Sequence, residues 1–190
     1  AEATTVVRVR VGDVATTDVV EPGRSFDAVL LDAPCTCLGT ARRHPEVLRK
    51  PGYGDVLETQ RALLDACVDR VKAPRGRLVY STCSVLPREC EDQVDGVIRR
   101  ARRRGVRLER VPIDPRPLGF AAAAQTPDGD LKILPWHLLE DDDAASQFSD
   151  GSHPVVVVPA SGGCDAHFVA RLVVVSRGDA AASDDDTSSH

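Results

Sequence analysis

The chain of 190 residues contains no methionine, few aromatic residues (4%) and no hydrophobic run that approaches the length of a membrane span. A helix that crosses a bilayer needs about 20 consecutive apolar residues, so a protein with such a helix is excluded. The six cysteines lack the regular spacing of a small secreted disulfide scaffold. We therefore expect a globular protein of a reducing compartment, without a membrane partner, in which most cysteines are small core residues.

The acidic and basic residues are unevenly distributed along the chain. The formal net charge of −5 argues against a protein that binds nucleic acid. Seven of the acids, however, lie in residues 140–143 and 184–186, and without them the chain is slightly basic. A basic group at residues 99–107 is equally compatible with a solvated helix face. Four basic residues lie shortly after the first cysteine: Arg42, Arg43, Arg49 and Lys50.

Two short apolar runs end in a cysteine. Residues 28–31 lead into Asp32, Pro34 and Cys35, and residues 77–82 lead into Cys83. Short apolar runs bounded by turn residues are typical of buried strands in a parallel sheet. The ligand crevice of an open α/β sheet lies at the carboxyl ends of its strands. The sequence therefore predicts an active site with two thiols at one edge of a sheet.

The remaining pattern predicts an α/β fold. A helix is expected to begin near Asp55 and to be stopped by residues 73–76, and a second to run from Pro87 to Gly105. A strand at residues 6–11 would end in a turn at Gly12 and Asp13. Further strands are expected at residues 106–113, 131–134, 155–158 and 167–175, with the last two forming an antiparallel hairpin.

Three motifs follow one another along the chain. Asp-Ala-Pro-Cys spans residues 32–35, Arg-Arg-His-Pro-Glu spans residues 42–46, and Tyr-Ser-Thr-Cys-Ser-Val-Leu-Pro spans residues 80–87. Together they resemble the motifs of the RsmB/Sun family of RNA (cytosine-5)-methyltransferases. The resemblance extends from about Val9 to Leu172. The middle motif is most similar to the branch that acts on bacterial small-subunit ribosomal RNA.

The resemblance implies a Rossmann-like methyltransferase sheet with helices on both faces and a C-terminal antiparallel hairpin. Residues 1–175 would be part of a catalytic domain, with residues 138–153 as a surface insertion and residues 176–190 as a disordered acidic tail. The family's glycine-rich cofactor loop does not occur in this sequence, so we expect the N-terminal strands of the sheet to be missing. Since methionine is absent too, we expect a fragment that is inactive alone and exposes a hydrophobic sheet edge.

The resemblance also implies a role for several residues. S-adenosylmethionine would be the cofactor, and Cys83 would attack carbon 6 of cytosine so that carbon 5 becomes nucleophilic. Cys35 would assist release of the product, although DNA cytosine methyltransferases use a Pro-Cys thiol as the nucleophile, so chemistry alone leaves the reverse assignment open. Asp13 and Asp32 would lie at the cofactor. The residues expected to contact RNA are Arg42, Arg43 and His44.

The sequence departs from the family at two places within the resemblance. Cys37 stands where the family has glycine, and residues 165–168 read Asp-Ala-His-Phe where the family has Asp-Gly-Phe-Phe. Cys37, Cys67 and Cys90 receive no role from the motifs. A zinc site at Cys35 and Cys37 would need a matching second pair, which the sequence does not offer, and no metal is expected.

Ribosomal RNA is the expected partner, with tRNA as the alternative. A monomer in the cytoplasm is expected, with a nuclear or organellar setting also open. Two other classes of protein compete with the enzyme. One is a catalytically inactive remnant that binds RNA or takes part in assembly, and the other is a cysteine-dependent hydrolase, for which only His44 offers a candidate base.

Overall fold

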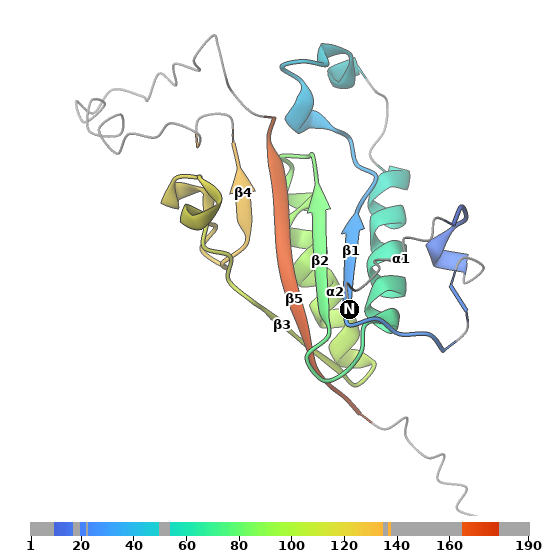
Figure 1. Ribbon diagram of the computed structural model, residues 1–190. Helices are drawn as coiled ribbons and strands as arrows, with labels where there is room; N and C mark the ends of the chain where they lie inside the picture. Colours follow the sequence, from blue (N-terminus) through green and yellow to red (C-terminus); the bar gives the residue numbers. More distant parts are fainter. Residues whose placement is uncertain are drawn as a thin grey trace, which may run out of the picture.

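The described residues of the chain form a mixed sheet and two α-helices, shown in Figure 1 as a computed structural model. The structure describes residues 10–16, 20–21, 23–49, 54–134, 137 and 165–178. No helix among these residues is long and apolar enough to cross a membrane.

The sheet has five strands, and the C-terminal strand lies at its centre (Figure 1). Their bounds are Ala28–Asp32 for β1, Arg77–Thr82 for β2, Val106–Arg110 for β3, Leu131–Ile133 for β4 and His167–Arg177 for β5. The order is β1-β2-β5-β3. Strands β3 and β4 pair with the same edge of β5, β3 with its C-terminal part and β4 with its N-terminal part. β1 and β2 are parallel, whereas β5 runs antiparallel to β2, β3 and β4.

Two α-helices connect these strands. Helix α1 (Gly54–Arg70) joins β1 to β2, and α2 (Glu91–Arg103) joins β2 to β3. The two helices pack against each other, and their buried residues share one core cluster with the inward-facing residues of the sheet. Short 3-10 helices form the connections, at Val14–Thr16, Leu38–Thr40, Pro45–Arg49, Pro87–Glu89, Arg116–Leu118 and Ala122–Ala124.

The core follows the alternation of the strands. Every second residue of β5 from Phe168 to Val174 is fully buried, namely Phe168, Ala170, Leu172 and Val174. Leu78 and Tyr80 continue this face on β2, and the rings of Tyr80 and Phe168 meet edge to face with centroids 6.3 Å apart. The opposite face is more open, with Leu30 of β1 71% exposed. The sheet is therefore held from one face by α1 and α2.

The structure confirms the α/β class and the Rossmann-like sheet, and refines several element bounds. Pro87 begins a 3-10 turn, and α2 starts only at Glu91. Both described α-helices lie on the same face, although helices on both faces were expected. Residues 6–9, 138–153 and 155–158 lie outside the described part, so the first expected strand, the insertion and one arm of the hairpin are not described there.

The last strand is longer than the sequence pattern indicated. Ser176 and Arg177 were assigned to the acidic tail, but they pair with Arg107 and Val106 of β3. The Arg177 side chain also donates a hydrogen bond of 2.9 Å to the carbonyl of Val71. Because Ser176 and Arg177 are polar, the alternation of apolar residues ends before them, although their backbone continues the strand.

Leu172→Ala tests the central position of β5. Loss of this fully buried side chain should lower the free energy of unfolding by about 2–5 kcal/mol, because a cavity remains. Leu118→Ala is the matched control, since Leu118 is 57% exposed and its loss should change stability by about 0.5 kcal/mol at most. Urea denaturation measures both, and equal effects would contradict the placement of β5 in the core.

Candidate active site

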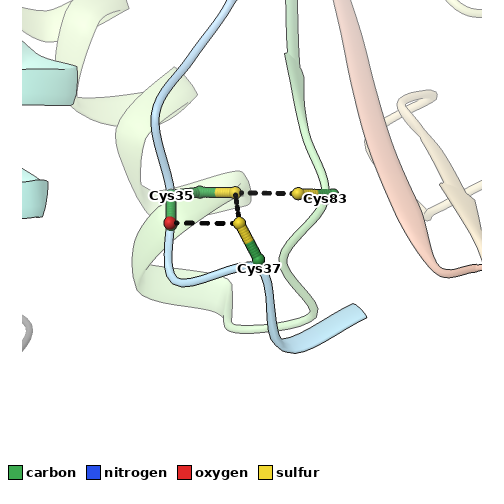
Figure 2. Close-up of side chains that lie close together, drawn as sticks. All are labelled: Cys35, Cys37 and Cys83. Carbon is green, nitrogen blue, oxygen red and sulfur yellow. Dashed lines mark hydrogen bonds between the residues drawn. The ribbon is translucent and has the colours of Figure 1, made fainter. Parts of the chain in front are cut away.

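Parallel pairing of β1 and β2 brings the two motif cysteines to one edge of the sheet. Asp32 is in register with Ser81, and the Ala33 N–H donates a 2.9 Å hydrogen bond to the Ser81 carbonyl just beyond the last pair. Cys35 and Cys83 follow these strand ends, and their sulfur atoms lie 3.2 Å apart, as Figure 2 shows. The predicted pair of neighbouring thiols is therefore present in the fold.

A third thiol, Cys37, joins this pair. Its sulfur lies 3.9 Å from the sulfur of Cys35 and 3.5 Å from the Cys35 carbonyl oxygen (Figure 2). The backbone of Cys37 is left-handed, with φ of 60°, which turns the chain back toward Cys35. The motifs gave Cys37 no role, and only its Cys-x-Cys spacing from Cys35 hinted at this placement.

The thiols of Cys35 and Cys83 are held in the protonated form. Burial raises the pKa of Cys83, and the neighbouring sulfur of Cys35 raises it further. Burial also raises the pKa of Cys35, and the hydrogen bond with Cys83 offsets part of that increase. A nucleophilic thiolate at this edge therefore requires a change in its surroundings, such as the approach of positive charge.

Buried Glu89 fixes the loop that carries Cys35 and Cys37. Its two carboxylate oxygens accept hydrogen bonds from the Thr36 N–H at 2.8 Å and the Thr36 hydroxyl at 2.7 Å. Gln60 of α1 donates to the Pro34 carbonyl at 2.9 Å and reaches Glu89 at 3.4 Å. Glu89 is fully buried, and these donors compensate its loss of hydration. Glu89 lies 53 residues from Thr36 and 29 from Gln60, so no local sequence motif indicates its positioning role.

Gly39 ties the same loop to two strands through its backbone. Its N–H donates to the Cys83 carbonyl at 2.9 Å, and its carbonyl accepts from the Ala166 N–H at 3.0 Å. A Cβ at this position would lie 2.3 Å from the Ala166 oxygen and 2.7 Å from the Cys83 oxygen. Close backbone contact of this kind requires glycine.

The basic loop is partly committed to contacts within the chain. Arg43 donates from Nε to both carboxylate oxygens of Asp165, at 3.0 and 2.9 Å, and its Nη2 also contacts Asp165. The Arg43 guanidinium holds the pKa of Asp165 below its usual range. His44 lies 3.1 Å from Glu46, and Arg42, Arg43 and His44 are all exposed. Arg43 therefore holds the loop against the residues before β5, and the outer surface of the loop faces solvent.

The two aspartates predicted at the cofactor occupy different surroundings. Asp32 ends β1 at the thiol edge, is exposed, and accepts a 2.9 Å hydrogen bond from the Ser81 hydroxyl. Asp13 accepts a 2.8 Å hydrogen bond from the Ala15 N–H, in a turn whose 3-10 helix contacts α1. Asp32 thus lies with the thiols, and the role of Asp13 stays a prediction.

The sequence of this chain is similar to those of known proteins. The model of a family described as 16S rRNA methyltransferase RsmB/F matches residues 3–173. Ribosomal RNA small subunit methyltransferase B of Shewanella oneidensis is 45% identical over 92 residues, which are 47% of this chain and 21% of the relative. The protein of the same name from Xanthomonas campestris pv. campestris is 42% identical over 97 residues, which are 50% and 22%. The matches thus span about a fifth of these relatives' length.

Two solved structures share the fold. PH0851 superposes with a TM-score of 0.52 and 25% identity, over 77% of this chain and 26% of that one. NSun6 from Pyrococcus horikoshii with SFG superposes with a TM-score of 0.55 and 24% identity, over 88% and 34%. The sheet and the helices of this chain therefore recur in larger proteins.

Gly39→Ala tests how the thiol loop is anchored. The new methyl group collides with two backbone oxygens, so the loop must shift and Cys83 with it. We expect a loss of stability of about 1–3 kcal/mol and faster reaction of Cys83 with a thiol reagent. Gly96→Ala is the matched control, because in α2 its methyl group meets only the flexible end of Arg100 and alanine favours helix. Thermal unfolding and thiol labelling read out both, and a neutral Gly39→Ala would contradict the anchoring.

Proposed function

The chain belongs to the 16S rRNA methyltransferase RsmB/F family, and from this premise we propose that it carries the catalytic thiols of an enzyme that methylates carbon 5 of a cytosine in ribosomal RNA. The observation that supports this most is the 3.2 Å contact between the Cys35 and Cys83 sulfurs at the carboxyl edge of parallel strands. A reaction on cytosine needs a thiol for addition and a second group for elimination, and this edge offers both.

Cys83 is the nucleophile in this proposal. Its thiolate adds to carbon 6 of the target cytosine, which places electron density on carbon 5. S-adenosylmethionine would supply the methyl group to carbon 5 and leave as S-adenosylhomocysteine. Transfer of the carbon 5 proton to water then restores the ring double bond and breaks the bond between Cys83 and carbon 6. The same covalent step splits one difficult substitution into two easier ones.

Cys35 assists the elimination. Its thiol lies 3.2 Å from the Cys83 sulfur, which is within reach for donating a proton to the departing thiolate. The Cys83 proton is released to solvent before the attack, and Cys35 keeps its own proton for the elimination. Both thiols have raised pKa values in the free chain. Docking of RNA against the basic loop would bring the guanidinium groups closer and favour the thiolate.

Asp32 fits a role at the cofactor. Its exposed carboxylate lies at the thiol edge, and the hydrogen bond from Ser81 engages Oδ1. A carboxylate in that position can hold a cationic or hydroxyl-bearing donor beside the target base. Asp13 is the second proposed cofactor residue, on the resemblance alone. Since the sequence has no glycine-rich cofactor loop, residues 1–190 alone should bind S-adenosylmethionine weakly and be inactive.

RNA would contact the loop of Arg42, Arg43 and His44, whose side chains are exposed beside the thiol edge. Phosphate contacts dominate the affinity for RNA, and arginine suits them well. The bacterial relatives favour ribosomal RNA over tRNA and a cytoplasmic setting.

Replacement of the two thiols in the complete enzyme tests their roles. Cys83→Ala should abolish both methyl transfer and any covalent RNA adduct, because no sulfur remains to attack carbon 6. Cys35→Ala should let the adduct accumulate, because addition proceeds while elimination slows. A denaturing gel separates adduct from free protein, and methylation is followed with labelled S-adenosylmethionine.

Each alternative gives a different result in that experiment. Adduct accumulation in Cys83→Ala and its loss in Cys35→Ala would reverse the two roles. An unmodified complete protein that binds RNA without methylation would favour the inactive remnant. Cys67→Ala is the matched control, because Cys67 is buried in α1 and should leave both readouts unchanged.

Arg42→Gln tests the RNA-binding loop. Loss of one phosphate contact should weaken binding uniformly across sequences and reduce the salt slope of the affinity by about 1. Arg103→Gln is the charge-matched control, since Arg103 is exposed in the last turn of α2 at the other end of the sheet. Fluorescence anisotropy at several salt concentrations measures the slope, and equal slopes for Arg42→Gln and the parent protein would refute the contact.

A further inference from the structure

Among the described residues, the candidate active-site edge contains three thiols, one more than the proposed reaction uses. The sulfurs of Cys35 and Cys83 are 3.2 Å apart, those of Cys35 and Cys37 are 3.9 Å apart, and all three lie within 4.8 Å of one another. Figure 2 shows the three side chains turned toward one another from two separate loops. Three cysteine sulfurs this close together could bind one metal ion.

The spacing suits a soft divalent cation. Zinc binds thiolate sulfur at about 2.3 Å, so the sulfurs of a tetrahedral site are about 3.8 Å apart. The observed separations of 3.2 and 3.9 Å bracket this value, and small side-chain rotations would accommodate a central ion. All three cysteines are partly exposed, so an ion has access to them.

The loop holds these ligands in place without an ion. The Cys37 carbonyl accepts hydrogen bonds from the Thr40 N–H at 2.9 Å and the Thr40 hydroxyl at 2.8 Å, which fixes its left-handed turn. Glu89 fixes Thr36 between the two loop cysteines. Ligands that are positioned beforehand lose less freedom when they bind a metal.

We propose that Cys35, Cys37 and Cys83 form a binding site for a soft divalent cation of the zinc and cadmium class, with a fourth position open to water. Binding forms three metal–sulfur bonds and releases three thiol protons, so the bound cluster carries one negative charge. The sequence has no second Cys-x-Cys pair to indicate this site, because the third ligand, Cys83, follows the end of another strand.

Metal binding and attack on cytosine exclude each other. The Cys83 lone pair that would add to carbon 6 is engaged in the metal–sulfur bond. An occupied site therefore blocks the enzyme reversibly, and removal of the ion restores it. The binding itself does not depend on the proposed function, and only this inhibition rests on it.

Cadmium titration of the purified protein tests the site. The protein is reduced with a phosphine, and binding is followed by the thiolate-to-cadmium charge-transfer band in the ultraviolet and by proton release in weak buffer. We expect one saturable site that releases about three protons per ion. Cys37→Gly removes the third ligand and suits the left-handed backbone, so the variant should fold while its affinity falls at least about tenfold and its band by about a third.

The control and the decisive outcomes follow from the same titration. Cys67→Ala removes a thiol buried in α1 and should titrate like the parent protein. Equal affinity and band for Cys37→Gly and the parent protein would overturn the site, as would an equal loss in Cys67→Ala.

Methylation by the complete enzyme, with zinc and then a chelator, separates the two proposals. Inhibition that a chelator relieves, and that Cys37→Gly weakens at least about tenfold, would support the metal site. Methylation without cadmium binding would refute the metal site alone. Cadmium binding without methylation would refute the proposed function alone.

Discussion

The parallel pairing of β1 with β2 is the constraint on which the rest of the site depends. The ladder sets Asp32 against Ser81 and continues through the bond from Ala33 to Ser81. Two strand ends at the same level then deliver Cys35 and Cys83 from segments 48 residues apart to a sulfur separation of 3.2 Å. A shift by one residue would turn every side chain of β1 to the other face and remove the contact.

The loops beyond this ladder are held by groups that differ in chemistry but act together. Glu89 binds the Thr36 segment, Gly39 joins the loop to Cys83 and Ala166 through its backbone, and Arg43 binds Asp165. Each connects residues near β1 with residues near β2 or β5. Rigid support of this kind keeps reactive groups in position, and it also explains why the arginine motif has a structural function besides any contact with RNA.

The electrostatics of the thiol edge suit a resting state. Burial raises the pKa of both Cys35 and Cys83, so these two thiols are protonated in the free chain. Formation of a thiolate then requires positive charge near these sulfurs, supplied either by the arginines of the basic loop once RNA is docked or by a bound soft cation. In our proposal, docked RNA leads to attack on the cytosine, whereas a bound cation blocks that attack. The addition to cytosine and the binding of a cation both use the Cys83 sulfur.

The sequence by itself determined the strands that lead to Cys35 and Cys83, the helix that follows each of these strands, and the family, because apolar runs, turn residues and motifs are local signals. Only the tertiary structure decided that Cys37 joins the pair, that Glu89 holds the loop and that Arg43 binds Asp165. These contacts join residues far apart in the sequence, such as Thr36 and Glu89 at a separation of 53. Loop conformation depends on such bonds, and no local periodicity encodes them.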